Sequence, residues 1–182
     1  MMIKNKRVQE DPWTHLEDEA PLCNDSFTVS WSRWQSLRTD WPVNSSPMGV
    51  RVPPDVRPQD LGEDAHRFAL IIIEYPKFTD GRGYSLAFLL RTRFAYTGEL
   101  RASGYVTREQ VGYLERCGFD SFLIKEGKDP HAALKGFGEL AMRYQPSADG
   151  VLPIWRHRVE SDRSQVGPVL PLSPTRHGES QG

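Results

Sequence analysis

The chain of 182 residues is 38% hydrophobic and carries 23 basic against 24 acidic side chains. Its length and composition suit a single domain with a hydrophobic core, together with arms or tails. The net charge of −1 argues against a dedicated nucleic-acid binder, and no apolar run approaches the length of a membrane span.

The pattern of residues 1–48 predicts an N-terminal arm that consists of strands and a helix. We expect this arm to pack on the core. We expect a short strand, a turn at Asp11-Pro12 and a second extended piece. Phe27–Val29 favours a strand, and Ser30 is a suitable N-cap for the helix that follows. This helix carries apolar residues at helical spacing, which are Trp31, Trp34, Leu37 and Trp41. We therefore interpret the tryptophans as packing residues rather than ligand groups.

Strands and helices alternate between residues 49 and 158, which we take as the core domain. The predicted strands are Gly49–Val52, Ala69–Glu74, Glu99–Val106 and Ser121–Ile124. Helices are predicted to begin at Pro58, near Arg82, after Thr107 and after Asp129. Alternation with short connections implies right-handed crossovers and a parallel sheet. We therefore expect an α/β fold with a small open parallel sheet of about four strands built from βα repeats.

The periodicity is lost in the last part of the chain. Val151–Trp155 is apolar enough to pack back on the core, whereas residues 159–182 are polar and rich in proline. We expect residues 159–182 to form a disordered tail, because such a segment cannot bury enough apolar surface to offset its conformational entropy.

The two cysteines, Cys23 and Cys117, form neither a CxxC pair nor a disulfide framework. The basic N-terminal stretch is not followed by the apolar region of a secretory signal. We therefore expect a cytoplasmic protein with reduced thiols and no membrane contact. Cys117 falls on the apolar stripe of its helix, so we interpret it as a core residue.

The segment Tyr75–Ser85, YPKFTDGRGYS, is the strongest candidate for a binding site. It follows the most apolar predicted strand, within residues 67–145, which carry 12 basic and 9 acidic side chains. In open parallel sheets, ligands settle beyond the carboxyl ends of the strands. Glycines, cationic side chains, hydroxyl groups and a helix N-terminus together suit a sulfate, sulfite, phosphate or carboxylate group. The candidate residues are Lys77, Thr79, Asp80, Gly81, Arg82, Gly83, Tyr84 and Ser85.

A purely structural interpretation of this loop stays open. Thr79 or Asp80 could cap the helix, the glycines could shape the turn, and Asp80 could pair with Arg82 or Lys77 and reduce the positive charge. Glu74, directly before the loop, is a candidate general base, and a paired structural carboxylate is the alternative.

The sequence does not match the common motifs for nucleotide binding, nucleophilic catalysis or metal binding. Gly81-Arg-Gly83-Tyr-Ser-Leu86 lacks the third glycine of the dinucleotide fingerprint, and neither a P-loop nor a GxSxG nucleophile elbow is present. The five histidines are scattered without metal-ligand spacing. We accordingly predict no cofactor and no metal site.

Several segments of the chain resemble a bacterial family of small proteins described as a domain of unknown function. The resemblance covers residues 3–158, and the segments that carry it most specifically are PKFTDGRGYS, GELRA and RCGFD, supported by EDPWTHLEDEAPL and DPHAALKGFGELAMRYQ. Members of that family are commonly labelled as oxidoreductases of sulfite reduction, because their genes lie beside that of a sulfite reductase.

The resemblance implies a role in assimilatory sulfur metabolism. Our leading hypothesis is an accessory protein that binds a small oxyanion, or sulfite reductase itself, at the PKFTDGRGYS loop. One alternative is an oxidoreductase of the same pathway, in which Lys77, Arg82 and Ser85 would orient the anion. A second alternative is a scaffolding module without a ligand, whose N-terminal tryptophans dock a partner.

Overall fold

The computed structural model describes residues 1–41, 48–138 and 147–148. Within them, eight strands form one sheet in the order β2-β1-β8-β7-β6-β5-β4-β3. The strands are β1 Met2–Lys4, β2 Arg7–Gln9, β3 Thr14–His15, β4 Phe27–Ser30, β5 Met48–Val52, β6 Leu70–Tyr75, β7 Glu99–Gly104 and β8 Ser121–Phe122. Strands β3 to β8 run parallel to one another, whereas β1 is antiparallel to both β8 and β2.

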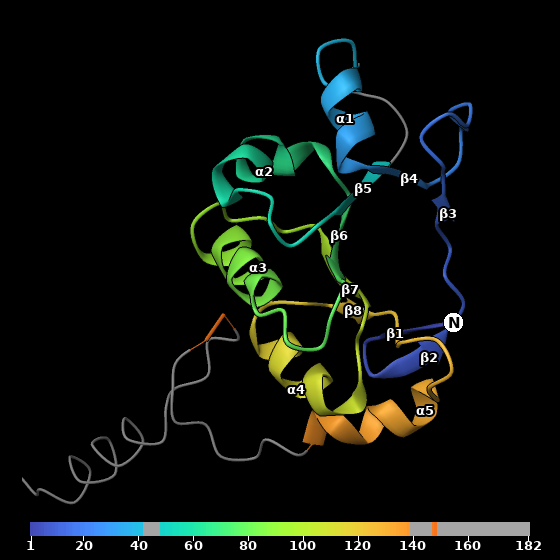
Figure 1. Ribbon diagram of the computed structural model, residues 1–182, viewed down its shortest axis with the longest axis vertical. Coiled ribbons are helices and arrows are strands. Elements are labelled where there is room, and N and C mark those ends of the chain that lie inside the picture. Colours follow the sequence, from blue (N-terminus) through green and yellow to red (C-terminus); the bar gives the residue numbers. More distant parts are fainter. Residues whose placement is uncertain (42–47, 139–146, 149–182) are drawn as a thin grey trace, which may run out of the picture.

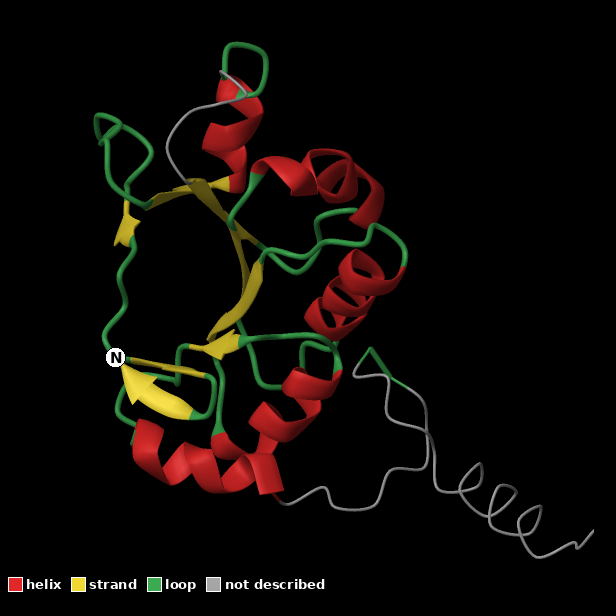
Figure 2. Ribbon diagram, turned by 180° about the vertical axis from the view of Figure 1, so that it is seen from behind, coloured by secondary structure: helices red, strands yellow, loops and turns green. Residues whose placement is uncertain are grey.

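The sheet is curled, and the chain connectivity explains why. β2 and β3 are its outermost strands, yet only residues 10–13 connect them. A flat sheet of this many strands would be about 34 Å wide at ~4.8 Å per strand, whereas the connection spans at most about 18 Å. The sheet must therefore curve until its two edges approach each other, as Figure 2 shows.

Helices cover the convex side of the curled sheet (Figure 1). The helices are α1 Trp31–Leu37, α2 Pro58–Asp64, α3 Arg82–Thr92, α4 Arg108–Arg116 and α5 Pro130–Ala133, with 3₁₀ turns η1 Ala65–Arg67 and η2 Leu134–Gly138. Their apolar stripes bury against alternate residues of the strands. Ile71 and Ile73 of β6 belong to this main core, while Leu70 and Ile72 point to the concave side and are buried there.

The predicted α/β class and the parallel strands of the core are confirmed. The four predicted strands correspond to β5, β6, β7 and β8, which are neighbours in sequence order. Several start and stop signals also hold, since Ser30 caps α1, Asp129 caps α5 and Thr107 forms a capping box with Gln110.

The predicted sheet size was wrong, because four strands understate a sheet of eight. The additional strands come from residues 1–41, which we expected to form an arm on the core. They are short, two to four residues each, so their periodicity is too brief to predict pairing. The predicted turn at Asp11-Pro12 falls in the β2–β3 connection, while the first tight turn lies at Asn5 and Lys6, which adopt φ values of 52° and 57°.

Trp34 is fully buried, packs edge-on against Phe68 and donates a hydrogen bond from Nε1 to Asp64 at 2.9 Å. Trp31 and Trp41 are half-buried against the same core. The interpretation of these tryptophans as packing residues is confirmed. The predictions for Val151–Trp155 and for a disordered tail at residues 159–182 lie outside the described residues.

Candidate functional site

The Tyr75–Ser85 loop lies at the carboxyl edge of the sheet, between β6 and α3. This is the edge at which the loops of parallel strands and the N-termini of the following helices converge. The loop's side chains are mostly exposed: Lys77, Thr79 and Arg82 face solvent, and Phe78 is 50% exposed. Its position therefore agrees with a binding loop.

Asp80 and Arg82 form a two-pronged ion pair. Arg82 Nε donates to Asp80 Oδ1 at 3.0 Å and its terminal nitrogen donates to Oδ2 at 2.7 Å, while the Arg82 backbone N–H also donates to Oδ1. The hydrogen bonds and charge of Arg82 lower the pKa of Asp80. Arg82 is therefore already paired with a carboxylate, as the structural interpretation of this loop expected. Lys77 forms no ion pair within the described residues.

The two glycines of the loop serve different purposes from those predicted. Neither adopts a positive φ. Gly81 is the N-cap residue of α3, and a Cβ there would meet nothing within 4 Å. At Gly83 a Cβ would lie 2.7 Å from the ring and hydroxyl of Tyr75. Gly83 is thus required by packing of α3 on β6 rather than by approach of a ligand.

Gln110 connects the loop to helix α4. Its side chain, 6% exposed, accepts a hydrogen bond from the Thr107 N–H at 3.0 Å and donates to the Tyr84 hydroxyl at 3.1 Å and to the Phe78 carbonyl at 3.5 Å. The Tyr84 ring packs between Tyr75 and Tyr113. Tyr84 is therefore a half-buried packing residue, and Gln110 is a supporting residue that the sequence argument missed.

The remaining predicted site residues do not gather at one point. Ser85 faces a groove on the outer side of α3 and α4 that Phe88 and Tyr113 also line. Glu74 is exposed on the concave side of β6, paired in register with Ser103. The structure therefore places Lys77, Phe78 and Thr79 at the exposed surface of the loop, and Ser85 and Glu74 on other faces.

A cavity of about 390 Å³ lies beside the loop at the carboxyl edge. Loops that follow three neighbouring parallel strands line it: Phe78 after β6, Tyr105 and Thr107 after β7, and Ile124 and Lys128 after β8. Its volume falls within the range of small-molecule sites in proteins. Phe78 was predicted only as part of its own loop, and no sequence pattern indicated that the loops after β7 and β8 would meet it.

A buried network of charges on the concave face was also missed. Arg101 of β7 is fully buried and donates to both carboxylate oxygens of Asp11, at 2.9 and 2.7 Å, and to Glu99 at 2.9 Å. Lys4 Nζ lies 2.6 Å from Glu99, and Ser121 donates to the same carboxylate. The partners come from β1, β7, β8 and the β2–β3 connection, so the network ties the two edges of the curled sheet together.

Both carboxylates of this network have lowered pKa values. Burial alone would raise the pKa of Asp11, but the charge and hydrogen bonds of Arg101 outweigh it. Burial opposes ionisation of Glu99 as well, and hydrogen bonds from Lys4, Ser121 and Arg101 lower its pKa overall. The network is therefore ionised at neutral pH, and its charges are balanced.

His15 bridges Asp11 and Thr28 in an arrangement that resembles a catalytic triad. His15 Nδ1 lies 2.8 Å from Thr28 Oγ1, and Nε2 lies 3.1 Å from Asp11 Oδ2. A nucleophilic hydroxyl must reach its substrate, yet Thr28 is fully buried. The arrangement therefore fixes the β3–β4 edge and does not form a reactive site.

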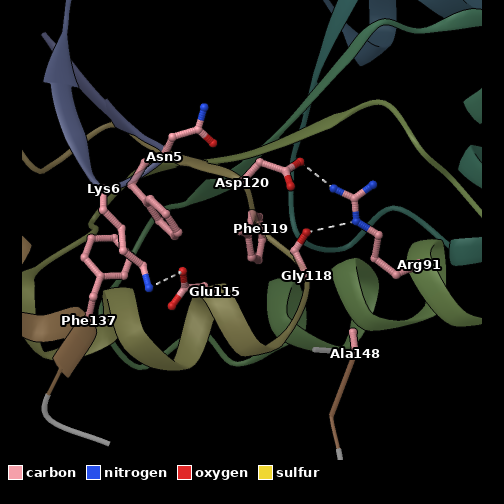
Figure 3. A pocket seen from close by; sticks show the side chains of 10 residues that line it. Asn5, Lys6, Arg91, Glu115, Gly118, Phe119, Asp120, Phe137 and Ala148 are labelled. Atoms are coloured by element: carbon pink, nitrogen blue, oxygen red, sulfur yellow. Dashed lines mark hydrogen bonds and ion pairs between the residues drawn. The ribbon is translucent and has the colours of Figure 1, made fainter. Parts of the chain in front are cut away.

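A second cavity, of about 510 Å³, lies at the opposite, amino edge of the sheet (Figure 3). The charged side chains that line it are already engaged by other groups of the protein. Arg91 donates to Asp120 and to the carbonyls of Gly118, Tyr96 and Gly98, and Lys6 lies 3.2 Å from Glu115. In barrel-like parallel sheets this edge serves stability while the carboxyl edge serves function. We therefore place the candidate site at the carboxyl edge.

Within residues 1–41, 48–138 and 147–148, no group of three or more His, Cys, Asp or Glu side chains could hold a metal ion. No helix among them is long and apolar enough to cross a membrane.

Comparison with protein families matches residues 49–155 to the family described as "Bacterial protein of unknown function (DUF934)". This match confirms the resemblance to a bacterial family of unknown function, over the βα core that carries the candidate loop. No curated protein matches the chain.

Proposed function

Because the chain belongs to the bacterial family of unknown function described as DUF934, we propose for it the role of an accessory protein of assimilatory sulfite reduction. It acts in the cytoplasm and binds sulfite reductase through the exposed Tyr75–Ser85 loop. The pathway rests on the family resemblance of the sequence. The binding role rests on the loop itself.

The observation that carries the binding role is the exposed pair Lys77 and Phe78 at the carboxyl edge. Phe78 is 50% exposed, and Lys77 has no ion-pair partner within the described part of the chain. Exposed aromatic side chains are enriched in protein interfaces, and a cation without an ion-pair partner beside one can steer an oppositely charged partner toward it. The fold holds this pair in place through Gln110, which donates to the Phe78 carbonyl.

Sulfite reductase is favoured over a bare oxyanion as the occupant. A sulfite, sulfate or phosphate ion would compete with Asp80 for Arg82, since the two side chains already form a two-pronged ion pair. It would then depend on Lys77 alone. The residues that could orient and transform an oxyanion are also dispersed, because Ser85 and Glu74 lie on other faces. These features support binding rather than catalysis.

Growth of a deletion strain on sulfate as the sole sulfur source tests this proposal. We expect slow growth that the wild-type gene restores and that a Lys77→Gln, Phe78→Ala double variant does not. The matched control is Lys6→Gln with Phe88→Ala, which changes the same residue types at the amino edge and on α3. Normal growth of the deletion strain on sulfate, with normal sulfite reductase activity in its extracts, would refute the proposal.

A further inference from the structure

We propose that the carboxyl-edge cavity of about 390 Å³ binds a small planar organic anion. This inference goes beyond the proposed function, because it concerns a separate ligand and requires no sulfite reductase. The cavity is formed by the loops after β6, β7 and β8, so three neighbouring parallel strands direct their carboxyl ends toward it.

The apolar walls of the cavity favour a ligand that has a planar, apolar part. Phe78 and Tyr105 stand edge to face at one side, with ring centroids 6.1 Å apart. Ile124, Ala132 and Ala133 supply aliphatic surface. Aromatic faces favour flat partners, because stacking adds to the free energy gained by burying apolar area. An inorganic oxyanion would leave this surface unused.

The charged side chains around the cavity are the basis for proposing an anionic group on the ligand. The lining carries two cationic side chains, Arg108 and Lys128, and two carboxylates, Glu109 and Asp129, so it is neutral by itself. The additional positive charge comes from Lys125, which lies next to the lining rather than in it. Lys125 Nζ lies 3.6 Å from the centre of the Tyr105 ring, and thus at the aromatic wall.

Both carboxylates are engaged by groups of the protein. Asp129 accepts hydrogen bonds from the backbone N–H groups of His131 and Ala132, at 2.9 and 3.2 Å. A hydrogen bond with the Thr107 side chain lowers the pKa of Glu109. Lys125 and Lys128, by contrast, form no ion pair within the described ranges. Charge complementarity therefore favours an anion over a cation.

Fluorescence titration with 8-anilinonaphthalene-1-sulfonate, a planar aromatic sulfonate, tests the inference on the full-length protein. The matched probe is N-phenyl-1-naphthylamine, which has the same ring system without the sulfonate. We expect saturable binding of the sulfonate and binding of the uncharged probe that is about two- to fivefold weaker, since an exposed charge pair is worth up to about fivefold.

The Lys125→Gln, Lys128→Gln double variant locates the site. It should weaken sulfonate binding about two- to fivefold for each lysine that contacts the sulfonate, whereas the matched control Lys6→Gln at the amino edge should bind like the wild type. Thermal unfolding of each variant verifies that the probe reads a native state. Equal binding of the charged and uncharged probes, equally tight binding of the planar cation thioflavin T, or unchanged sulfonate affinity of the natively folded double variant would overturn the inference. Each of these results leaves the growth test of the proposed function unaffected.

Discussion

Gly81 and Gly83 stand two residues apart at the start of α3, yet their surroundings differ sharply. A side chain at Gly81 would enter open space, whereas one at Gly83 would meet the buried Tyr75 ring. The buried ring has little room to move, because protein interiors are close-packed. Alanine substitutions at the two positions can therefore be compared. Both remove a glycine, but only the one at Gly83 overpacks a buried side chain.

We predict that Gly83→Ala is less stable to unfolding than Gly81→Ala by about 1–3 kcal/mol, the usual cost of overpacking. Both variants gain from removing a glycine from the unfolded chain, so this gain cancels in their difference. Because alanine is favoured over glycine inside a helix and disfavoured at an N-cap, only the clash with Tyr75 makes Gly83→Ala the less stable variant. Urea unfolding of the two variants measures this difference. Equal free energies of unfolding would show that α3 does not pack on β6 as described.

Arg101 shows how a residue can be important and still escape prediction. It stands two positions from Glu99 on β7, so a contact between these two is foreseeable from strand periodicity. Another of its partners, Asp11, lies 90 residues away in the β2–β3 connection. No local pattern links the two, because the contact exists only once the sheet has curled.

Stability should depend on pH through Asp11 and Glu99. Their pKa values in the folded state lie below the ordinary 3.8 and 4.5, so the stabilisation is complete above pH 4.5 and is lost as the pH falls below these values. We predict that the free energy of unfolding falls more steeply with acid for the wild type than for Asp11→Asn. Chemical unfolding between pH 6 and pH 3 measures the two slopes. Parallel slopes would contradict an ionised network.

At the scale of elements, helix α4 and the candidate loop depend on one another through Gln110. The capping box was predictable, because Thr107 and Gln110 stand at the required spacing. The contacts of Gln110 with Tyr84 and Phe78 were not, since they require α3 and α4 to lie side by side. The spacing of residues in the sequence thus predicts where helix α4 begins. Its contacts with the candidate loop depend on how the helices pack and were not predictable from spacing.

We predict that Gln110→Ala lowers the free energy of unfolding by about 1–3 kcal/mol, because it removes the cap and leaves buried polar groups without a partner. Tyr84→Phe keeps the capping box and should cost less. Thermal and urea unfolding of both variants provide the comparison. If Tyr84→Phe proved as destabilising as Gln110→Ala, the cap would contribute nothing and the account of Gln110 would be wrong.

At the scale of the molecule, the sequence predicts the core strands β5 to β8, whereas the strand pairings that close the curl were not predicted. β6 and β7 have six residues each and a clear strand pattern, whereas β1, β2 and β3 have only two or three. The position of the candidate loop followed from the long strands alone. The pairing of Arg82 with Asp80 was one of the alternatives that the sequence left open. The cavity beside the loop was not predicted, because it depends on how three loops pack together.

The central claim is that the exposed loop at the carboxyl edge is a binding surface for sulfite reductase. Isothermal titration of the purified full-length protein against the purified reductase from the same organism tests it most directly. We predict saturable binding that the Lys77→Gln, Phe78→Ala double variant weakens at least about tenfold, as expected for loss of an interface anchor. The control variant Lys6→Gln should bind like the wild type. Absence of binding by the wild-type protein, or equal affinity of the double variant, would contradict the claim.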